Sequence, residues 1–199
     1  RVLADGGIVA FNIANVGRKP YLPLESFVIE ILMRIGYKIL NEIIWNKGAS
    51  AGGSCAWGSW MSASNPTLRD VHEYVIIAQK TSSKSDTVTK FPLEKISTHT
   101  VNYDNRTISV NPGDFINNVW NMGTESAKRV KHPAPFPVEF PYRVILFYSK
   151  QGDIILDPFM GSGSVAIAAM LTKRKFVGYE ISEEYLNNAN TRISDLKSL

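Results

Sequence analysis

The chain has 199 residues, of which 44% are hydrophobic, and a formal net charge of +4. This size and hydrophobic content predict one globular domain, or one domain with an insertion, and the modest positive charge suits a polyanionic partner without requiring one. The apolar runs are far shorter than the ~18 residues of a membrane span, and the one cysteine, Cys55, excludes an internal disulfide; we therefore expect a cytoplasmic protein that does not enter a membrane.

The first residues, 2–7, have the pattern of a helix end followed by a glycine turn. A helix end needs a helix before it, so we expect the natural polypeptide to extend upstream. Residues 8–13 form an apolar run bounded by turn residues, and this run predicts a buried parallel strand.

Strand-like and helix-like segments alternate along the rest of the chain. The expected helices are 22–35, 137–148, 164–171 and 183–196, and the further expected strands are 37–45, 72–79, 153–156 and 175–179. This alternation predicts an α/β open sheet. The polar stretch 80–118 is expected to be a surface insertion, partly mobile.

The strongest functional signal is a strand that ends in Asp157 and is followed by a glycine loop and a helix start. Such a loop exposes bare backbone beside a helix amino terminus, where a nucleoside-bearing ligand can lie. Glu180 ends the next expected strand and is placed to accept hydrogen bonds from ribose hydroxyls. The segment therefore predicts a cofactor site.

Two cofactors compete for this loop. Gly161, Gly163 and Ala166 satisfy the dinucleotide pattern G-x-G-x-x-G/A, so an NAD-binding oxidoreductase is one alternative. Asp157 would repel a pyrophosphate, however, whereas a carboxylate suits the ammonium and sulfonium groups of S-adenosyl-L-methionine. We therefore predict S-adenosylmethionine as the cofactor. A glycine turn that binds no ligand is less favoured, because the two acids and the glycines fall in register.

Two neighbouring segments carry a family resemblance: KHPAPFPVE at 131–139 and DPFMGSG at 157–163. Together with GRKPY at 17–21, AWGS at 56–59 and the stretch 65–74, they make nearly the whole chain resemble the permuted class of DNA amino-methyltransferases, the N4-cytosine and N6-adenine family. The resemblance implies a class I S-adenosylmethionine-dependent methyltransferase (Rossmann-like) sheet in permuted order, incomplete at its N-terminal side. It further implies methyl transfer to N4 of cytosine, slightly favoured, or N6 of adenine in double-stranded DNA, within a restriction–modification system.

The same resemblance assigns roles to individual residues. It places Asp157, Phe159, Gly161 and Gly163 in the cofactor loop, Glu180 at the ribose, and His132 and Pro133 in the wall that holds the methionine end of the cofactor. From the residues alone, the histidine would be a surface or helix-start residue and the prolines an extended linker.

The catalytic tetrapeptide of this family, [D/S/N]-P-P-[Y/F/W], is not found, because the sequence contains no Pro-Pro pair. In the family it lies upstream, beside a central strand. We therefore expect the chain by itself to be poorly stable and inactive, and to need the missing N-terminal part or a homodimeric partner. The alternative is a catalytically inactive remnant that binds DNA or the cofactor.

Basic and aromatic side chains mark a candidate DNA surface, since they can bind phosphates and stack on displaced bases. The candidates are Arg18, Lys19, Lys47, Trp57, Trp60 and Arg69. Scattered lysines are often only solvated surface, so the Gly/Ser-rich loop 46–69 with its two tryptophans is the stronger signal. The expected organisation is a catalytic subdomain remainder at 1–79 including that loop, a target-recognition insertion at 80–118, and a cofactor-binding subdomain at 119–199.

Overall fold

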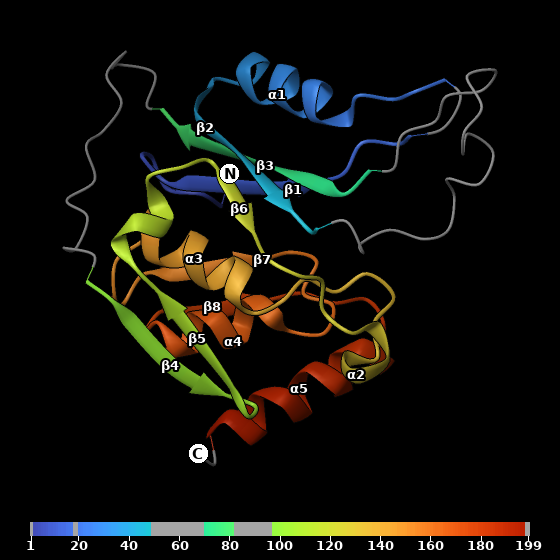
Figure 1. Cartoon of the computed structure of the whole chain (residues 1–199). Coiled ribbons are helices and arrows are strands. Elements are labelled where there is room, and N and C mark those ends of the chain that lie inside the picture. Colours follow the sequence, from blue (N-terminus) through green and yellow to red (C-terminus); the bar gives the residue numbers. More distant parts are fainter. Residues whose placement is uncertain (1, 18–19, 49–69, 82–96, 198–199) are drawn as a thin grey trace. The chain divides into compact units, whose positions relative to one another are not determined.

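The computed structural model describes residues 2–17, 20–48, 70–81 and 97–197. The chain divides into two compact units, Arg1–Lys90 with Asn117–Gly123 and Phe91–Ile116 with Thr124–Leu199 (Figure 1). The first unit contains a four-stranded sheet, and the second contains two separate strand pairs. Among the described residues, no helix combines the length and apolar character that crossing a membrane requires.

The first unit is built on a four-stranded sheet with the order β1-β3-β2-β6. Its strands are β1 (Ile8–Ile13), β2 (Tyr37–Asn46), β3 (His72–Lys80) and β6 (Val119–Asn121). Strands β1 and β2 run antiparallel to β3, whereas β6 runs parallel to β2. The strand at 8–13 is therefore confirmed, but its expected parallel pairing and full burial are wrong, because an apolar run does not reveal which strand will pair with it.

Helix α1 (Leu24–Arg34) covers this sheet with one side only. Leu32 packs with Ile76 and Ala78 of β3, while Phe27 and Ile31 on the helix remain exposed. The apolar spacing correctly predicted the helix, since residues three and four apart share a face. Gly36 follows the end of the helix and has a φ of +91°, a backbone conformation that residues with a side chain rarely adopt.

The second unit is centred on a parallel strand pair and its helices. The pair is β7 (Ile154–Asp157) with β8 (Lys175–Gly178), and the helices are α2 (Ala127–Val130), α3 (Glu139–Tyr148), α4 (Ser164–Leu171) and α5 (Glu183–Lys197). Helix α4 connects β7 to β8, so the carboxyl ends of both strands meet at one edge. Ile155 and Phe176 pack on the core of this unit, which confirms the strand–helix–strand order expected from the sequence.

A hairpin of β4 (His99–Tyr103) and β5 (Arg106–Val110) also belongs to the second unit. Its turn residues Asp104 and Asn105 have φ values of 49° and 57°, as a two-residue hairpin turn requires. Tyr103, Ile108 and Val110 are buried in the core of the unit. This part of 80–118 is thus a hairpin that packs one face on the core and leaves the other exposed, because its apolar residues alternate with polar ones.

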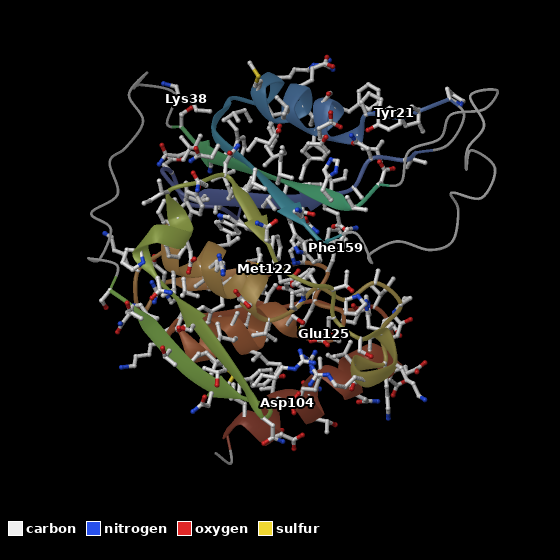
Figure 2. The ribbon with its side chains drawn as sticks, viewed as in Figure 1. Tyr21, Lys38, Asp104, Met122, Glu125 and Phe159 are labelled. Atoms are coloured by element: carbon white, nitrogen blue, oxygen red, sulfur yellow. The ribbon has the colours of Figure 1, made fainter. Side chains whose placement is uncertain are left out.

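A buried carboxylate joins the hairpin to the segment before α2 (Figure 2). The Glu125 side chain is 1% exposed and accepts hydrogen bonds from Arg106 at 3.0 Å and Arg129 at 2.7 Å. Burial alone would raise the pKa of Glu125, but the bonds from Arg129 and the Ser126 backbone N–H, with the charge of Arg106, lower it below its ordinary value.

Replacing Glu125 with glutamine should lower the free energy of unfolding by about 2 kcal/mol at neutral pH, because two guanidinium groups lose their shared partner. A carboxyl whose pKa is lowered by folding stabilises the fold above its unfolded pKa and loses that contribution as the pH falls through its folded pKa. Urea unfolding at several pH values should therefore show the two proteins converging in acid. Glu30→Gln is the control, since Glu30 is 62% exposed and its ion pair contributes little; an equal loss in both variants would contradict the prediction.

Candidate cofactor site

The loop between β7 and α4 adopts a backbone that requires glycine at two positions. Gly161 has a φ of +51° and Gly163, which caps α4, a φ of +81°. A Cβ on Gly161 would stand 2.9 Å from Nε2 of His132, and a Cβ on Gly163 would stand 3.1 Å from Cβ of Ala189. The loop therefore presents bare backbone in a place where side chains do not fit.

Backbone hydrogen bonds hold this loop against the end of β8. The Met160 N–H donates to the Tyr179 carbonyl at 2.9 Å, and the Gly163 N–H donates to the Met160 carbonyl at 2.9 Å. These hydrogen bonds thus join the carboxyl ends of both strands and the start of α4 at one edge.

Two carboxylates lie at this edge, one at the end of each strand. Asp157 accepts a hydrogen bond from the Phe159 N–H at 3.0 Å. Glu180 accepts from the Gly161 N–H at 2.8 Å and, through its other oxygen, from the Ser182 N–H at 2.8 Å. Glu180 therefore supports the glycine loop directly, a role that the sequence did not indicate.

The surroundings of the two carboxylates shift their pKa values in opposite directions. Burial raises the pKa of Asp157, the hydrogen bond from Phe159 opposes that rise, and the negative charge of Glu180 adds to it. The hydrogen bond from Ser182, helped by that from Gly161 and opposed by desolvation, lowers the pKa of Glu180. Because Asp157 and Glu180 repel, a bound cation near them would be stabilised.

His132 lies against the glycine loop, as the distance to Gly161 shows. Its ring contacts the Tyr185 ring edge-on, with centroids 4.7 Å apart, and its Nδ1 accepts a hydrogen bond from the Ala134 N–H at 3.3 Å. Pro133 follows it and is exposed. The structure thus brings His132 together with the loop residues, although they lie almost thirty positions apart in the chain.

Exposed apolar side chains lie close to both acids in the sequence. Phe159 is 85% exposed, and Tyr179 and Ile181 flank Glu180 and are also exposed. Such groups on a polar edge are typical of a surface that a planar ring covers. The roles of Tyr179 and Ile181 were not predicted from the sequence; their positions directly before and after a strand-ending acid were the available signal.

Most of the candidate DNA-contacting residues lie outside the described part of the chain; these are Arg18, Lys19, Trp57, Trp60 and Arg69. Lys47 is described: its Nζ pairs with Glu73 at 3.0 Å and lies 5.7 Å from the centre of the Trp45 ring. This side chain is largely buried, so its charge is already engaged within the first unit.

Comparison with known proteins gives concordant matches. The chain is 30% identical to the type II methyltransferase M.MthZI of Methanothermobacter thermautotrophicus, with 100% of this chain and 57% of the relative covered. It is 31% identical to the type II methyltransferase M.MjaI of Methanocaldococcus jannaschii, with 92% and 60% covered. The chain therefore spans less than two thirds of the length of these curated relatives.

A solved structure supports the same fold. A Thermus thermophilus protein described as a DNA modification methylase, crystallised with S-adenosyl-L-methionine, superposes with a TM-score of 0.66 at 22% identity, covering 98% of this chain and 71% of that protein. The class I methyltransferase fold expected from the sequence is thereby confirmed. A family model described as DNA methylase matches residues 1–191. The chain belongs to this DNA methylase family.

Proposed function

We propose that this chain forms the S-adenosylmethionine-binding part of a DNA methyltransferase that modifies an exocyclic amino group, N4 of cytosine or N6 of adenine. The observation that carries the proposal is the pair Asp157 and Glu180 at adjoining strand ends, with the bare backbone of Gly161 donating a hydrogen bond to Glu180. Two mutually repelling carboxylates suit a cationic nucleoside and disfavour the pyrophosphate of NAD. Membership of the DNA methylase family supports the same substrate class.

The residues fit this cofactor in their chemistry. A carboxylate oxygen can accept more than one hydrogen bond, so Glu180 can accept from ribose hydroxyls while it retains Gly161 and Ser182. Asp157 supplies negative charge, and the His132 ring lies against the loop at Gly161. When bound, S-adenosylmethionine supplies a methyl group on a positively charged sulfur.

The DNA and the cellular setting are part of the proposal. Two relatives are named as type II methyltransferases, which supports double-stranded DNA as the partner and a restriction–modification system in the cytoplasm as the setting. The hairpin β4–β5 lies within 80–118, which we propose as the target-recognition region. The exocyclic amine needs its lone pair localised for attack, a task that the family assigns to a tetrapeptide this sequence does not contain.

Calorimetric titration of the chain with S-adenosylmethionine and, separately, with NAD tests the proposal. We expect a single site for S-adenosylmethionine with a dissociation constant in the micromolar range and no heat from NAD. Binding of NAD alone would instead support the oxidoreductase alternative. An electrophoretic shift of duplex DNA at low salt tests the partner, and binding of the cofactor with no DNA binding would overturn the DNA part of the proposal.

A further inference from the structure

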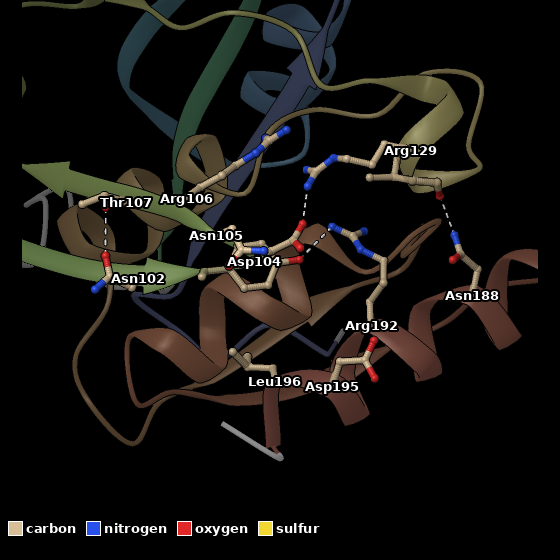
Figure 3. Close-up of a pocket in the computed structure, with 12 residues that line it drawn as sticks. Asn102, Asp104, Asn105, Arg106, Thr107, Arg129, Asn188, Arg192, Asp195 and Leu196 are labelled. Carbon is tan, nitrogen blue, oxygen red and sulfur yellow. Dashed lines mark hydrogen bonds and ion pairs between the residues drawn. The ribbon is translucent and has the colours of Figure 1, made fainter.

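Arg192 of α5 connects two segments that are distant in the sequence. Its Nη1 donates a hydrogen bond to the Ser162 carbonyl in the cofactor loop, and its Nη2 donates to the Tyr103 hydroxyl at the end of β4 at 3.2 Å. Figure 3 shows Arg192 reaching from α5 towards the hairpin. Arg192 lines a cavity of about 1090 Å³. All of these groups belong to the second unit.

We propose that Arg192 is a positioning residue for the cofactor loop, with Tyr103 fixing the guanidinium from the other side. The inference rests on the proposed function, since it concerns the same cofactor site. Under this proposal, α5 and the β4–β5 hairpin affect cofactor affinity by ordering the loop and not by contacting the cofactor through these groups.

The glycines on both sides of Ser162 leave this part of the loop with few steric restraints of its own. Ser162 stands between Gly161 and Gly163, and both glycines have positive φ values. Without Cβ atoms on either side, steric contacts restrain the orientation of the Ser162–Gly163 peptide only weakly. Some other contact must fix that peptide if the loop is to be ordered before the cofactor arrives.

The Ser162–Gly163 peptide is held by hydrogen bonds at both ends. Its carbonyl accepts the bond from Arg192, and its N–H, which belongs to Gly163, donates to the Met160 carbonyl at 2.9 Å. Ser162 is 5% exposed, so water cannot readily replace the arginine as a donor. Rotation of the peptide would break both bonds and redirect the backbone beside Gly161.

Arg192 differs in its partners from the other arginines that line the cavity. Arg106 and Arg129 bind the buried Glu125, which is a structural ion-pair cluster. The hydrogen-bond partners of Arg192, in contrast, are a carbonyl and a hydroxyl. Its planar fork suits two acceptors in different directions, a geometry that a lysine ammonium does not reproduce.

Calorimetric titration of the chain with S-adenosylmethionine, combined with amide hydrogen exchange by NMR, tests this role. Arg192→Gln should weaken binding about tenfold, and Tyr103→Phe about threefold. In the Arg192→Gln background, Tyr103→Phe should have no further effect, because its influence passes through the arginine. The Gly163 amide should exchange faster in Arg192→Gln before any cofactor is added, and Arg192→Lys should restore only part of the affinity.

The matched control is Arg174→Gln. Arg174 is a buried arginine, whereas Arg192 is half-buried, and both donate to backbone carbonyls; the partners of Arg174, Thr172 and Ser149, lie at the carboxyl ends of α4 and α3. This variant should lower the melting temperature without changing the affinity or the exchange of the Gly163 amide.

The outcomes separate the two proposals. No binding of S-adenosylmethionine by the wild type would reject the proposed cofactor and this inference with it. Binding by the wild type with equal affinity in Arg192→Gln would overturn this inference alone. Should Arg192→Gln fail to fold, Tyr103→Phe and Arg192→Lys decide the matter by the same two measurements, and unchanged affinity in both would overturn it.

Discussion

Replacing Asp157 with asparagine should weaken the binding of S-adenosylmethionine at least tenfold, on the order of 1.4 kcal/mol, because a cationic ligand loses a nearby, partly desolvated negative charge. The amide oxygen can still accept the Phe159 N–H, so the loop geometry should persist. Titration calorimetry at neutral pH measures the change. Glu30→Gln removes an exposed carboxylate in the other unit and should leave the affinity unchanged.

The same substitution should not destabilise the protein when the cofactor is absent. The pKa of Asp157 is raised by burial and by Glu180, so its contribution to stability is present below the unfolded pKa and is lost as the pH rises through the folded pKa. Thermal unfolding should show the variant at least as stable as the wild type at neutral pH, with the difference vanishing in acid. Lower stability together with unchanged affinity would mean that Asp157 is structural and would remove the main support for the proposed cofactor.

Replacing Gly161 with alanine should abolish measurable binding of the cofactor. The new methyl group would stand 2.9 Å from Nε2 of His132, and the backbone has a φ of +51°, so either the histidine or the loop must move. Moving the loop would also disturb the hydrogen bond from the Gly161 N–H to Glu180. Titration calorimetry is again the measurement, and chemical unfolding shows whether the fold survives.

Gly152→Ala separates the effect of a steric clash on cofactor binding from the effect of backbone strain at a positive φ. Gly152 has a φ of +86°, but a Cβ there would meet nothing within 4 Å. Its replacement should cost about 1 kcal/mol of stability from backbone strain and leave the affinity unaltered. If both alanine variants bind the cofactor like the wild type, the close approach of His132 to Gly161 has no part in binding.

The sequence predicted most helices and strands of the described chain because their apolar periodicity and glycine stops are local properties. Helix α4 was placed at its observed bounds, and β7 and β8 to within about a residue. The hairpin β4–β5 was overlooked among polar residues, although its Asp104-Asn105 turn and alternating apolar residues were visible. The short strand β6 has only three residues, too few for a periodic signal.

By itself, the sequence determined which chemical groups are present at the candidate site: a strand-ending acid, a glycine loop, a second acid and a histidine before them. These follow from residue identity and short spacing, as does the family. Only the tertiary structure shows that Glu180 accepts a hydrogen bond from the Gly161 N–H and that His132 lies against the loop. The same is true of the hydrogen bonds that Arg192 donates to the Ser162 carbonyl and the Tyr103 hydroxyl. Such contacts join residues 19 to 89 positions apart, and side-chain direction in packed helices and loops, rather than any local pattern, determines which of them meet.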